Sequence, residues 1–168
     1  RTVHSERPFV VMPGMPQGRD MGEAGPKSAT LIEVTGGAVA VREVPTSVAE
    51  FRRVAVDVTG AEDETEIRRR LRAGLDDAAR ATISDAAILR LTLAGRTPRA
   101  WALRRDRDQW AETARMAAEE TGRLRIEGLE LDVSPPGEGA EAPGDAVAEL
   151  DRLMAALRAE PGFLAEAR

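Results

Sequence analysis

The stretch Val54-Ala-Val-Asp-Val58, followed by Asp63-Glu-Thr-Glu66, decides the fold of the chain. Valine at every second position is typical of a strand with one buried face. Asp63 can cap the N-terminus of a helix, and Glu66 stands three residues further on, as in a capping box. The apolar residues that follow recur at helical spacing on one face: Ile67, Leu71, Leu75 and Ala78. The stretch therefore predicts a strand and then a helix over residues 63–81.

The same order repeats further along the chain. Alternating leucines predict a second strand: Leu89, Leu91 and Leu93. A second helix is predicted over residues 107–121, with Asp106 as its cap and Trp110 on its inner side. Gly122 follows at the position where a helix commonly ends.

A third strand is predicted over residues 124–133, but its apolar residues change parity at Gly128. Leu124 and Ile126 are even-numbered, whereas the later apolar residues are odd-numbered: Leu129, Leu131 and Val133. A β-bulge at Gly128 would keep all five on one face. The order β-α-β-α-β over residues 49–134 predicts an α+β domain with two helices on a small sheet.

Shorter β elements are predicted upstream of this domain. Phe9–Met12 is an apolar run ended by Pro13-Gly14, and it predicts a strand. Residues 29–44 predict a β-hairpin, because Gly36-Gly37 supplies the two positive φ angles of a tight turn. That turn sets the register by placing two apolar pairs on one side: Val34 opposite Val39, and Ile32 opposite Val41.

The end of the chain predicts a linker and an amphipathic helix. Residues 135–144 are rich in Pro and Gly, which is typical of a linker. The helix is predicted within residues 145–168, and its apolar stripe is a candidate docking surface for a partner or a second copy: Val147, Leu150, Met154 and Leu157. The predicted domain boundaries are thus 1–48, 49–134, 135–144 and 145–168.

The composition fits a protein with an apolar core and a charged surface. Apolar residues make up 42% and charged residues 32%, and no apolar run reaches the roughly 20 residues of a membrane-spanning helix. The absence of Cys excludes disulfides and thiolate sites and fits a cytoplasmic location. The net charge is -5, and the acidic excess lies in residues 135–168. Because the first residue is Arg1, we expect the chain to begin inside a longer protein.

The segment over residues 13–27 is the most specific in the sequence. It reads Pro-Gly-Met-Pro-Gln-Gly-Arg-Asp-Met-Gly-Glu-Ala-Gly-Pro-Lys. It resembles the segment Pro-Gly-Asn-x-Gln-Gly-Arg-His, then Glu-x-Gly, of SbcD-type DNA-repair exonucleases in the calcineurin-like metallophosphoesterase family. The matching residues are Pro13, Gly14, Gln17, Gly18, Arg19, Glu23 and Gly25. Met15 and Asp20 depart from the pattern, since the family usually has Asn and His there.

The resemblance implies a role for each region. Residues 1–48 would be the last strands of a catalytic sandwich, and residues 49–134 a capping domain that shapes access to its active site. Catalysis in the family needs two divalent metal ions of the Mn type, held by several His and Asp residues. The chain has one His, His4, which matches no ligand position. We therefore expect no catalytic residue, no metal ligand and no hydrolysis by this chain alone. The implied partner is an SMC-like ATPase.

A second candidate site spans residues 96–107, where five Arg surround one Trp. Guanidinium groups hold phosphates and an indole stacks on bases, so the candidate DNA contacts are Arg96, Arg99, Trp101, Arg104 and Arg105. The alternative is a solvated loop before a helix, with Trp101 packed inward.

The sequence thus predicts the cap and substrate-recognition region of a DNA-repair exonuclease. Two alternatives stay open. One is an oligomerisation or partner-docking module without nucleic-acid contact, and the other is the cap of an enzyme that hydrolyses a small phosphodiester.

Overall fold

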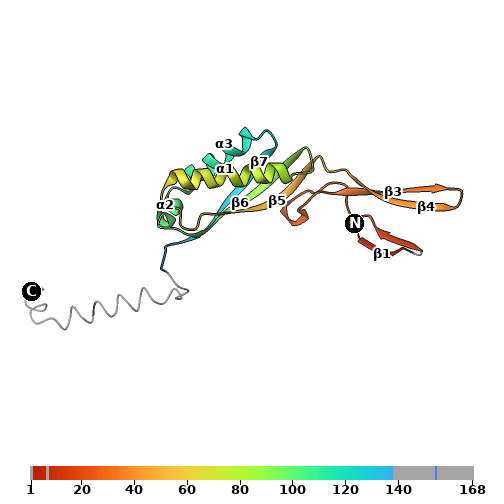
Figure 1. Cartoon of the computed structure of the whole chain (residues 1–168), viewed down its shortest axis with the longest axis horizontal. Coiled ribbons are helices and arrows are strands. Elements are labelled where there is room, and N and C mark those ends of the chain that lie inside the picture. Colours follow the sequence, from red (N-terminus) through yellow and green to blue (C-terminus); the bar gives the residue numbers. More distant parts are fainter. Residues whose placement is uncertain (1, 7, 138–153, 155–168) are drawn as a thin grey trace, which may run out of the picture. The chain divides into compact units, whose positions relative to one another are not determined.

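A computed structural model describes residues 2–6, 8–137 and 154 (Figure 1). The elements are, in chain order, β1 (Thr2–Glu6), β2 (Phe9–Met12), the single 3-10 turn η1 (Met21–Glu23), β3 (Ser28–Thr35), β4 (Ala38–Pro45), β5 (Ala49–Asp57), α1 (Glu64–Ala81), β6 (Ala86–Arg96), α2 (Ala100–Arg105), α3 (Arg107–Glu120) and β7 (Leu124–Ser134). This combination of helices and small sheets confirms the predicted α+β class.

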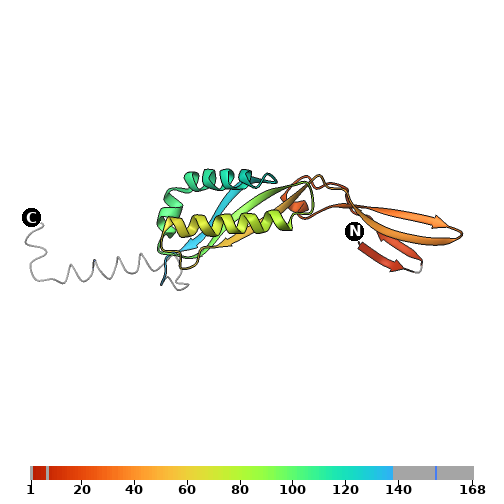
Figure 2. The ribbon, with the colours of Figure 1, turned by 45° about the horizontal axis from the view of Figure 1, so that its top comes forward.

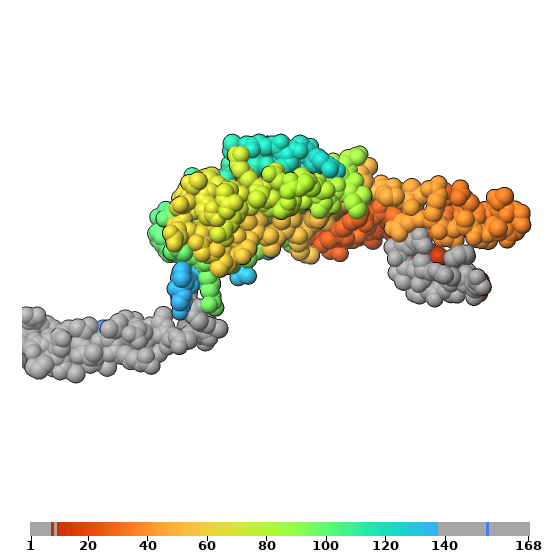
Figure 3. Space-filling model, in the orientation of Figure 1, coloured from red at the N-terminus to blue at the C-terminus, as the bar shows by residue number. Residues whose placement is uncertain are grey.

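Residues 49–134 form a helical layer on a parallel sheet, and they are called the cap below after the role that the sequence predicts for them. The strand order is β5-β6-β7, and both neighbouring pairs are parallel. α1 connects β5 to β6, and α2 with α3 connects β6 to β7. Because β-α-β crossovers are right-handed and each new strand adds on the same side, both connections fall on one face. Figures 1 and 2 show α1 and α3 on that face, and Figure 3 shows their surfaces in contact.

The core of the cap lies between the sheet and the two helices. Every second residue of β6 is fully buried against the helices: Ala87, Leu89, Leu91 and Leu93. The predicted apolar face of α1 supplies the opposite side: Ile67, Leu71, Leu75 and Ala78. Trp110 of α3 is 4% exposed and faces inward, as predicted.

Both α1 and α3 begin where predicted, with Asp63 and Asp106 at their N-cap positions, but only Asp63 makes a side-chain capping bond. Asp63 caps α1, because its carboxylate accepts a hydrogen bond of 2.8 Å from the Glu66 N–H. Asp106 makes no such capping bond, since its carboxylate binds the guanidinium of Arg105 at 2.6 Å. The solvated-loop alternative before α3 is wrong, because α2 occupies that stretch and leaves Trp101 66% exposed. Six residues are too few for helical periodicity to show in a sequence.

The predicted bulge in the third cap strand is present. Leu89 pairs with Ile126 and Arg90 pairs with Gly128, so Glu127 is the extra residue on β7. The five apolar residues on both sides of the bulge therefore share the helix-covered face.

The β3–β4 hairpin has the predicted register. Val34 pairs with Val39 and Ile32 with Val41. The turn residues Gly36 and Gly37 have φ angles of +58° and +83°. The apolar side chains of the hairpin remain exposed, with Ile32 at 58% and Val34 at 68%. β1 and β2 form a separate antiparallel pair.

The predicted linker and C-terminal helix lie outside the described residues, apart from residues 135–137 and Met154. Met154 is helical and 37% exposed, and the other three residues of the docking stripe lie outside the described part of the chain. Among the helices that are described, none has the length and apolar character that a bilayer span requires.

Candidate functional site

The segment over residues 13–27, called the motif loop below, is attached to the first strand of the cap. The side-chain amide of Gln17 donates to the carbonyl oxygen of Ala49 at 2.7 Å and accepts from the N–H of Val48 at 2.9 Å. It also donates to the carbonyl of Gly18 at 2.9 Å. Further along the loop, the N–H of Gly25 donates to the carbonyl of Phe51 at 2.8 Å. Two residues of the family motif thus hold the loop on the start of β5.

Arg19 and Glu23 pair with each other inside the motif loop. The Glu23 carboxylate accepts from the Arg19 backbone N–H at 2.8 Å and from its guanidinium at 2.8 Å. These hydrogen bonds from Arg19 lower the pKa of the Glu23 carboxyl. The Arg19 side chain remains 79% exposed, so it can still meet an anion from the solvent side.

Further positions of the motif loop set its shape. A Cβ at Gly18 would lie 2.9 Å from the carbonyl oxygen of Glu23, so a larger residue would clash with the backbone of the loop itself, while the ring of Phe51 lies at contact distance, 3.5 Å away. Asp20, which stands where the family has His, caps η1 by accepting from the N–H of Gly22 at 2.7 Å. Pro13 and Gly14 come directly after β2 and open the loop.

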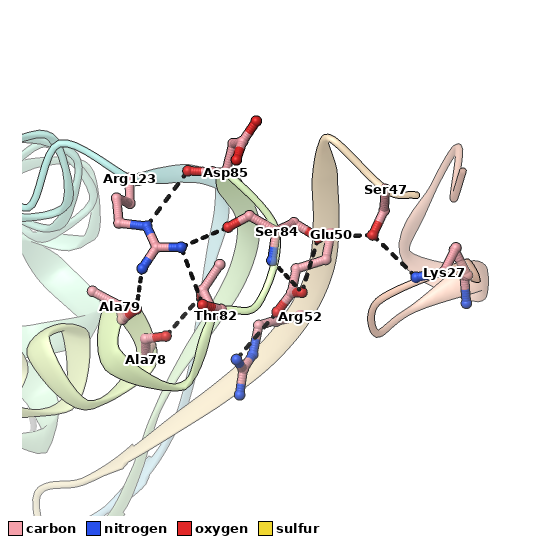
Figure 4. A network of polar contacts seen from close by, with 10 residues as sticks. All are labelled: Lys27, Ser47, Glu50, Arg52, Ala78, Ala79, Thr82, Ser84, Asp85 and Arg123. Atoms are coloured by element: carbon pink, nitrogen blue, oxygen red, sulfur yellow. Dashed lines mark hydrogen bonds and ion pairs between the residues drawn. The ribbon is translucent and has the colours of Figure 1, made fainter. Parts of the chain in front are cut away.

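A polar network continues from the motif loop into the cap (Figure 4). The Lys27 N–H donates to the hydroxyl of Ser47 at 3.1 Å, which lies 2.7 Å from the hydroxyl of Ser84. Ser84 donates through its hydroxyl and its N–H to the carboxylate of Glu50 at 3.1 and 3.3 Å. The guanidinium of Arg52 also binds the Glu50 carboxylate, at 3.2 Å. Glu50 is 1% exposed, and a buried carboxylate persists only with such partners.

Arg123 joins the end of α1 to the start of β6 (Figure 4). Its guanidinium donates to the carbonyl oxygens of Ser84 at 2.6 Å, Thr82 at 3.1 Å and Ala79 at 3.3 Å. These carbonyls belong to the helix end and to the turn after it, where backbone acceptors lack partners within the helix. Arg123 therefore fixes the turn that carries Ser84 to the Glu50 network.

Sequence reasoning missed this network. One signal was available for Glu50, because it lies at an even-numbered position of β5, in step with the buried residues Val56 and Val58. A charged residue at a core position indicates a buried polar partner. No comparable signal marks Ser84, whose side-chain partners Ser47 and Glu50 lie more than thirty residues away, or Arg123, whose partners are backbone carbonyls.

The arginines of residues 96–107 are largely engaged within the cap. Arg99 pairs with Glu64 at 3.2 Å, and Arg104 donates to the carbonyl oxygen of Val133. Arg105 pairs with Asp106 and lies over the ring of Trp101, 4.7 Å from its centroid. The pairing with Arg105 lowers the pKa of the Asp106 carboxyl. Arg96 is exposed and has no ion pair within the described residues. The structure thus places Arg105 beside an exposed Trp101. Arg99 is bound to α1 through Glu64, whereas Arg96 has no acidic partner in the described part of the chain.

The described residues do not fit a metal centre. Within residues 2–6, 8–137 and 154, no three His, Cys, Asp or Glu side chains come together as potential ligands. His4 lies on β1, and it is the one His in the sequence. A two-metal phosphoesterase site needs several such ligands, so no step of metal chemistry is assigned to these residues.

Residues 49–134 are an α+β domain joined through a Gly-rich loop to preceding strands. The family described as "Metallophosphoesterase YhaO, middle domain" matches residues 51–134, which is 84 of the 168 residues. The match extends from β5 to the end of β7, and the chain therefore belongs to this metallophosphoesterase family. No curated protein and no solved structure shows significant similarity to the chain.

Proposed function

We propose that this chain is the cap and substrate-recognition region of a metal-dependent DNA-repair exonuclease of the SbcD type. The supporting observation is the attachment of the motif loop to the cap. The loop resembles the exonuclease segment that follows the metal-binding strand, and its Gln17 and Gly25 bind the backbone of β5. Through these bonds the loop would hold the cap in position beside an active site formed by preceding residues.

The β3–β4 hairpin fits the same proposal. Its exposed Ile32 and Val34 have no helix or sheet to cover them within the described residues. A two-stranded hairpin is marginal in water unless a further sheet or helix packs on it. The remaining strands of a catalytic sandwich would supply that cover.

The test starts from the complete reading frame that encodes this chain. We expect the segment upstream of Arg1 to carry Asp-x-His, Gly-Asn-His and Gly-His-x-His, and the full protein with Mn²⁺ to degrade linear DNA. The 168-residue chain alone should degrade neither DNA nor a generic phosphodiester. Hydrolysis of the small phosphodiester alone would contradict the exonuclease proposal and favour the small-substrate alternative. Chelator-sensitive hydrolysis by the isolated chain would contradict the absence of catalytic residues.

The chain offers a matched pair of variants for the role of the loop. Gln17 and Gln109 are its two glutamines, and Gln109 lies exposed on α3. Gln17→Ala should slow DNA hydrolysis by the full protein by about tenfold or more, because the misplacement of groups around an active site is costly. Gln109→Ala should leave the rate unchanged. Equal effects of the two substitutions on the rate would show that Gln17 and the motif loop have no specific role in hydrolysis.

We further propose that the C-terminal segment docks a partner. Its stripe comprises Val147, Leu150, Met154 and Leu157, and burial of such side chains stabilises by about 1.5–3 kcal/mol each before ordering costs. The partner would be an SMC-like ATPase, with a second copy of the chain taking its place in isolation. Deletion of residues 144–168 should abolish self-association in sedimentation while the cap keeps its melting temperature. Unchanged self-association would refute this assignment.

A further inference from the structure

The face of the cap sheet opposite α1 and α3 is uncovered within the described residues. In both strand pairs the residues that face the helices are buried, for example Leu91 with Leu129, while their sequence neighbours point the other way. Parallel sheets are normally covered on both faces. The residues on the uncovered face therefore show what kind of partner it suits.

Three arginines, one from each strand, lie on this face, and Arg53 on β5 lies beside the motif loop. Arg53 of β5 is the direct cross-strand partner of Arg90 of β6. Arg125 of β7 pairs with Ile88, two residues before Arg90 on the same side of β6. Neighbouring strands are about 4.8 Å apart, so the three side chains form one basic strip across the sheet.

The strip is only partly neutralised. Arg90 binds Glu127 at 3.0 Å and approaches Glu130 at 3.8 Å. Arg53 and Arg125 are exposed and have no ion pair within the described residues. Like charges directly opposite each other on neighbouring strands are destabilising. Glu127 and Glu130 offset the charge of Arg90 alone, so Arg53 and Arg125 are the guanidinium groups most open to an added anion.

The surroundings set the extent of the strip. Phe51 lies beside it, half-buried, at the contact between the motif loop and β5. Arg53 and Phe51 also line a hollow of about 280 Å³ together with Gly25 and Pro26 of the loop. Toward the opposite end of the same face, the exposed Asp132 of β7 lies opposite Ala94 of β6 in the strand register, so that end repels anions.

We propose that this strip binds the phosphate backbone of a nucleic acid through Arg53, Arg90 and Arg125. A phosphodiester backbone offers one negative charge per nucleotide, which several guanidinium groups in a row can engage at once. Phe51 offers a ring on which a base can stack. The inference rests on the proposed function, because a strip that begins beside the motif loop at Arg53 would guide a phosphodiester chain toward the active site.

The experiment measures binding by the full 168-residue chain with a fluorescent single-stranded oligonucleotide of about 20 nucleotides. The variant Arg53→Gln/Arg90→Gln/Arg125→Gln should weaken binding about tenfold or more at low salt. It should also lower the log–log salt slope by about 2, because three single-strand phosphate contacts are removed. The matched control makes the same change of charge on the helix-covered side: Arg69→Gln, Arg72→Gln and Arg115→Gln. The control should bind within about twofold of the unchanged chain.

Two further measurements keep the result interpretable. Replacing the same three residues by Lys keeps the positive charge, and it should keep most of the affinity and the salt slope. The melting temperature of the Gln variant should change little, because the relief of the Arg53–Arg90 repulsion offsets the loss of the exposed ion pairs of Arg90 with Glu127 and Glu130.

Several outcomes would overturn the inference. Equal loss in the control variant, absence of binding at low salt, or loss that follows Arg96, Arg104 and Arg105 instead would each remove the strip as the site. Competition by poly-glutamate as strong as by unlabelled oligonucleotide would assign the face to an acidic protein. If the full protein degrades DNA while the Gln variant binds normally, the inference fails and the proposed function stands. If the strip binds DNA but the full protein does not hydrolyse it, the proposed function fails alone.

Discussion

The cap sheet and the β3–β4 hairpin use similar residues with different results. In β6 the leucines on one face are buried to 0–1% exposure, whereas Ile32 and Val34 of the hairpin are 58% and 68% exposed. Both regions have regular pairing, and both have apolar side chains in step with the strand period. The difference is that α1 and α3 cover the cap sheet, while no described element covers the hairpin.

This difference shows where stability resides. Each apolar side chain moved from water to the interior contributes about 1.5–3 kcal/mol to the free energy of unfolding. The cap buries many such side chains, whereas the hairpin buries few. The cap should therefore fold as a unit on its own contacts, and the hairpin should depend on what packs against it. The following predictions test that division, beginning with the largest expected effect.

Truncation of a central core residue should have the largest effect. Leu91 is 0% exposed on the middle strand of the cap. Leu91→Ala should lower the free energy of unfolding by about 3–4 kcal/mol, because it removes apolar contacts and leaves a cavity. Denaturant unfolding measures this value. A loss below about 1 kcal/mol would mean that the cap core can collapse around the site. It would contradict the conclusion that the buried leucines make the cap more stable than the hairpin.

Removal of the buried carboxylate should have the next largest effect. Glu50→Ala leaves Ser84 without its acceptor and should cost about 2 kcal/mol in the free energy of unfolding. Glu50→Gln keeps an acceptor oxygen and should cost clearly less. If the two variants are equally stable, the network of Figure 4 contributes no specific stabilisation.

Acid should weaken the first turn of α1. Glu66 binds Arg69 and Arg70, each at 2.7 Å, and these hydrogen bonds lower the pKa of its carboxyl from 4.5 to about 2. A carboxyl with a lowered pKa stabilises the fold above pH 4.5 and loses that effect as the pH falls toward 2. Glu66→Gln should therefore flatten the dependence of melting temperature on pH within this window. Glu119→Gln, an equal change of charge on α3, should leave the dependence unaltered.

A polar residue on the hairpin should have the smallest effect. Val34→Ser should change the free energy of unfolding of the cap by less than about 0.5 kcal/mol, because Val34 already faces solvent. Val56→Ser is its counterpart on β5, where the side chain is 5% exposed, and it should destabilise strongly. Similar losses from both substitutions would show that the hairpin has a covered face after all.

Much of the fold could be predicted because local periodicity and burial agree. The alternating leucines of β6, the Asp63 cap and the bulge beside Gly128 all appear in the structure as the pattern indicates. Gly74 shows the limit of local reasoning. Its helix propensity predicts a cost of about 1 kcal/mol, yet a Cβ there would lie 2.7 Å from the Val56 side chain, so the glycine permits close packing of α1 on β5.

The candidate site was less accessible from sequence. The resemblance identifies the motif loop, but the partners of Gln17 lie about thirty residues away and follow no local pattern. The Arg-rich stretch drew attention to residues 96–107, where ion pairs and backbone carbonyls engage Arg99, Arg104 and Arg105. The arginines of the uncovered face are scattered singly over three strands. Only the strand register brings them together.

The two tryptophans have a practical consequence for optical measurements. The chain has 2 Trp and no Tyr, and both Trp lie in the cap. Trp110 is 4% exposed beneath the guanidinium of Arg68, while Trp101 is 66% exposed beside Arg105. Emission from Trp110 should thus be blue-shifted and protected from iodide, and that from Trp101 red-shifted and readily quenched. Fluorescence will follow the cap alone and remain silent on the hairpin, whose folding needs a label or an isotope-detected signal of its own.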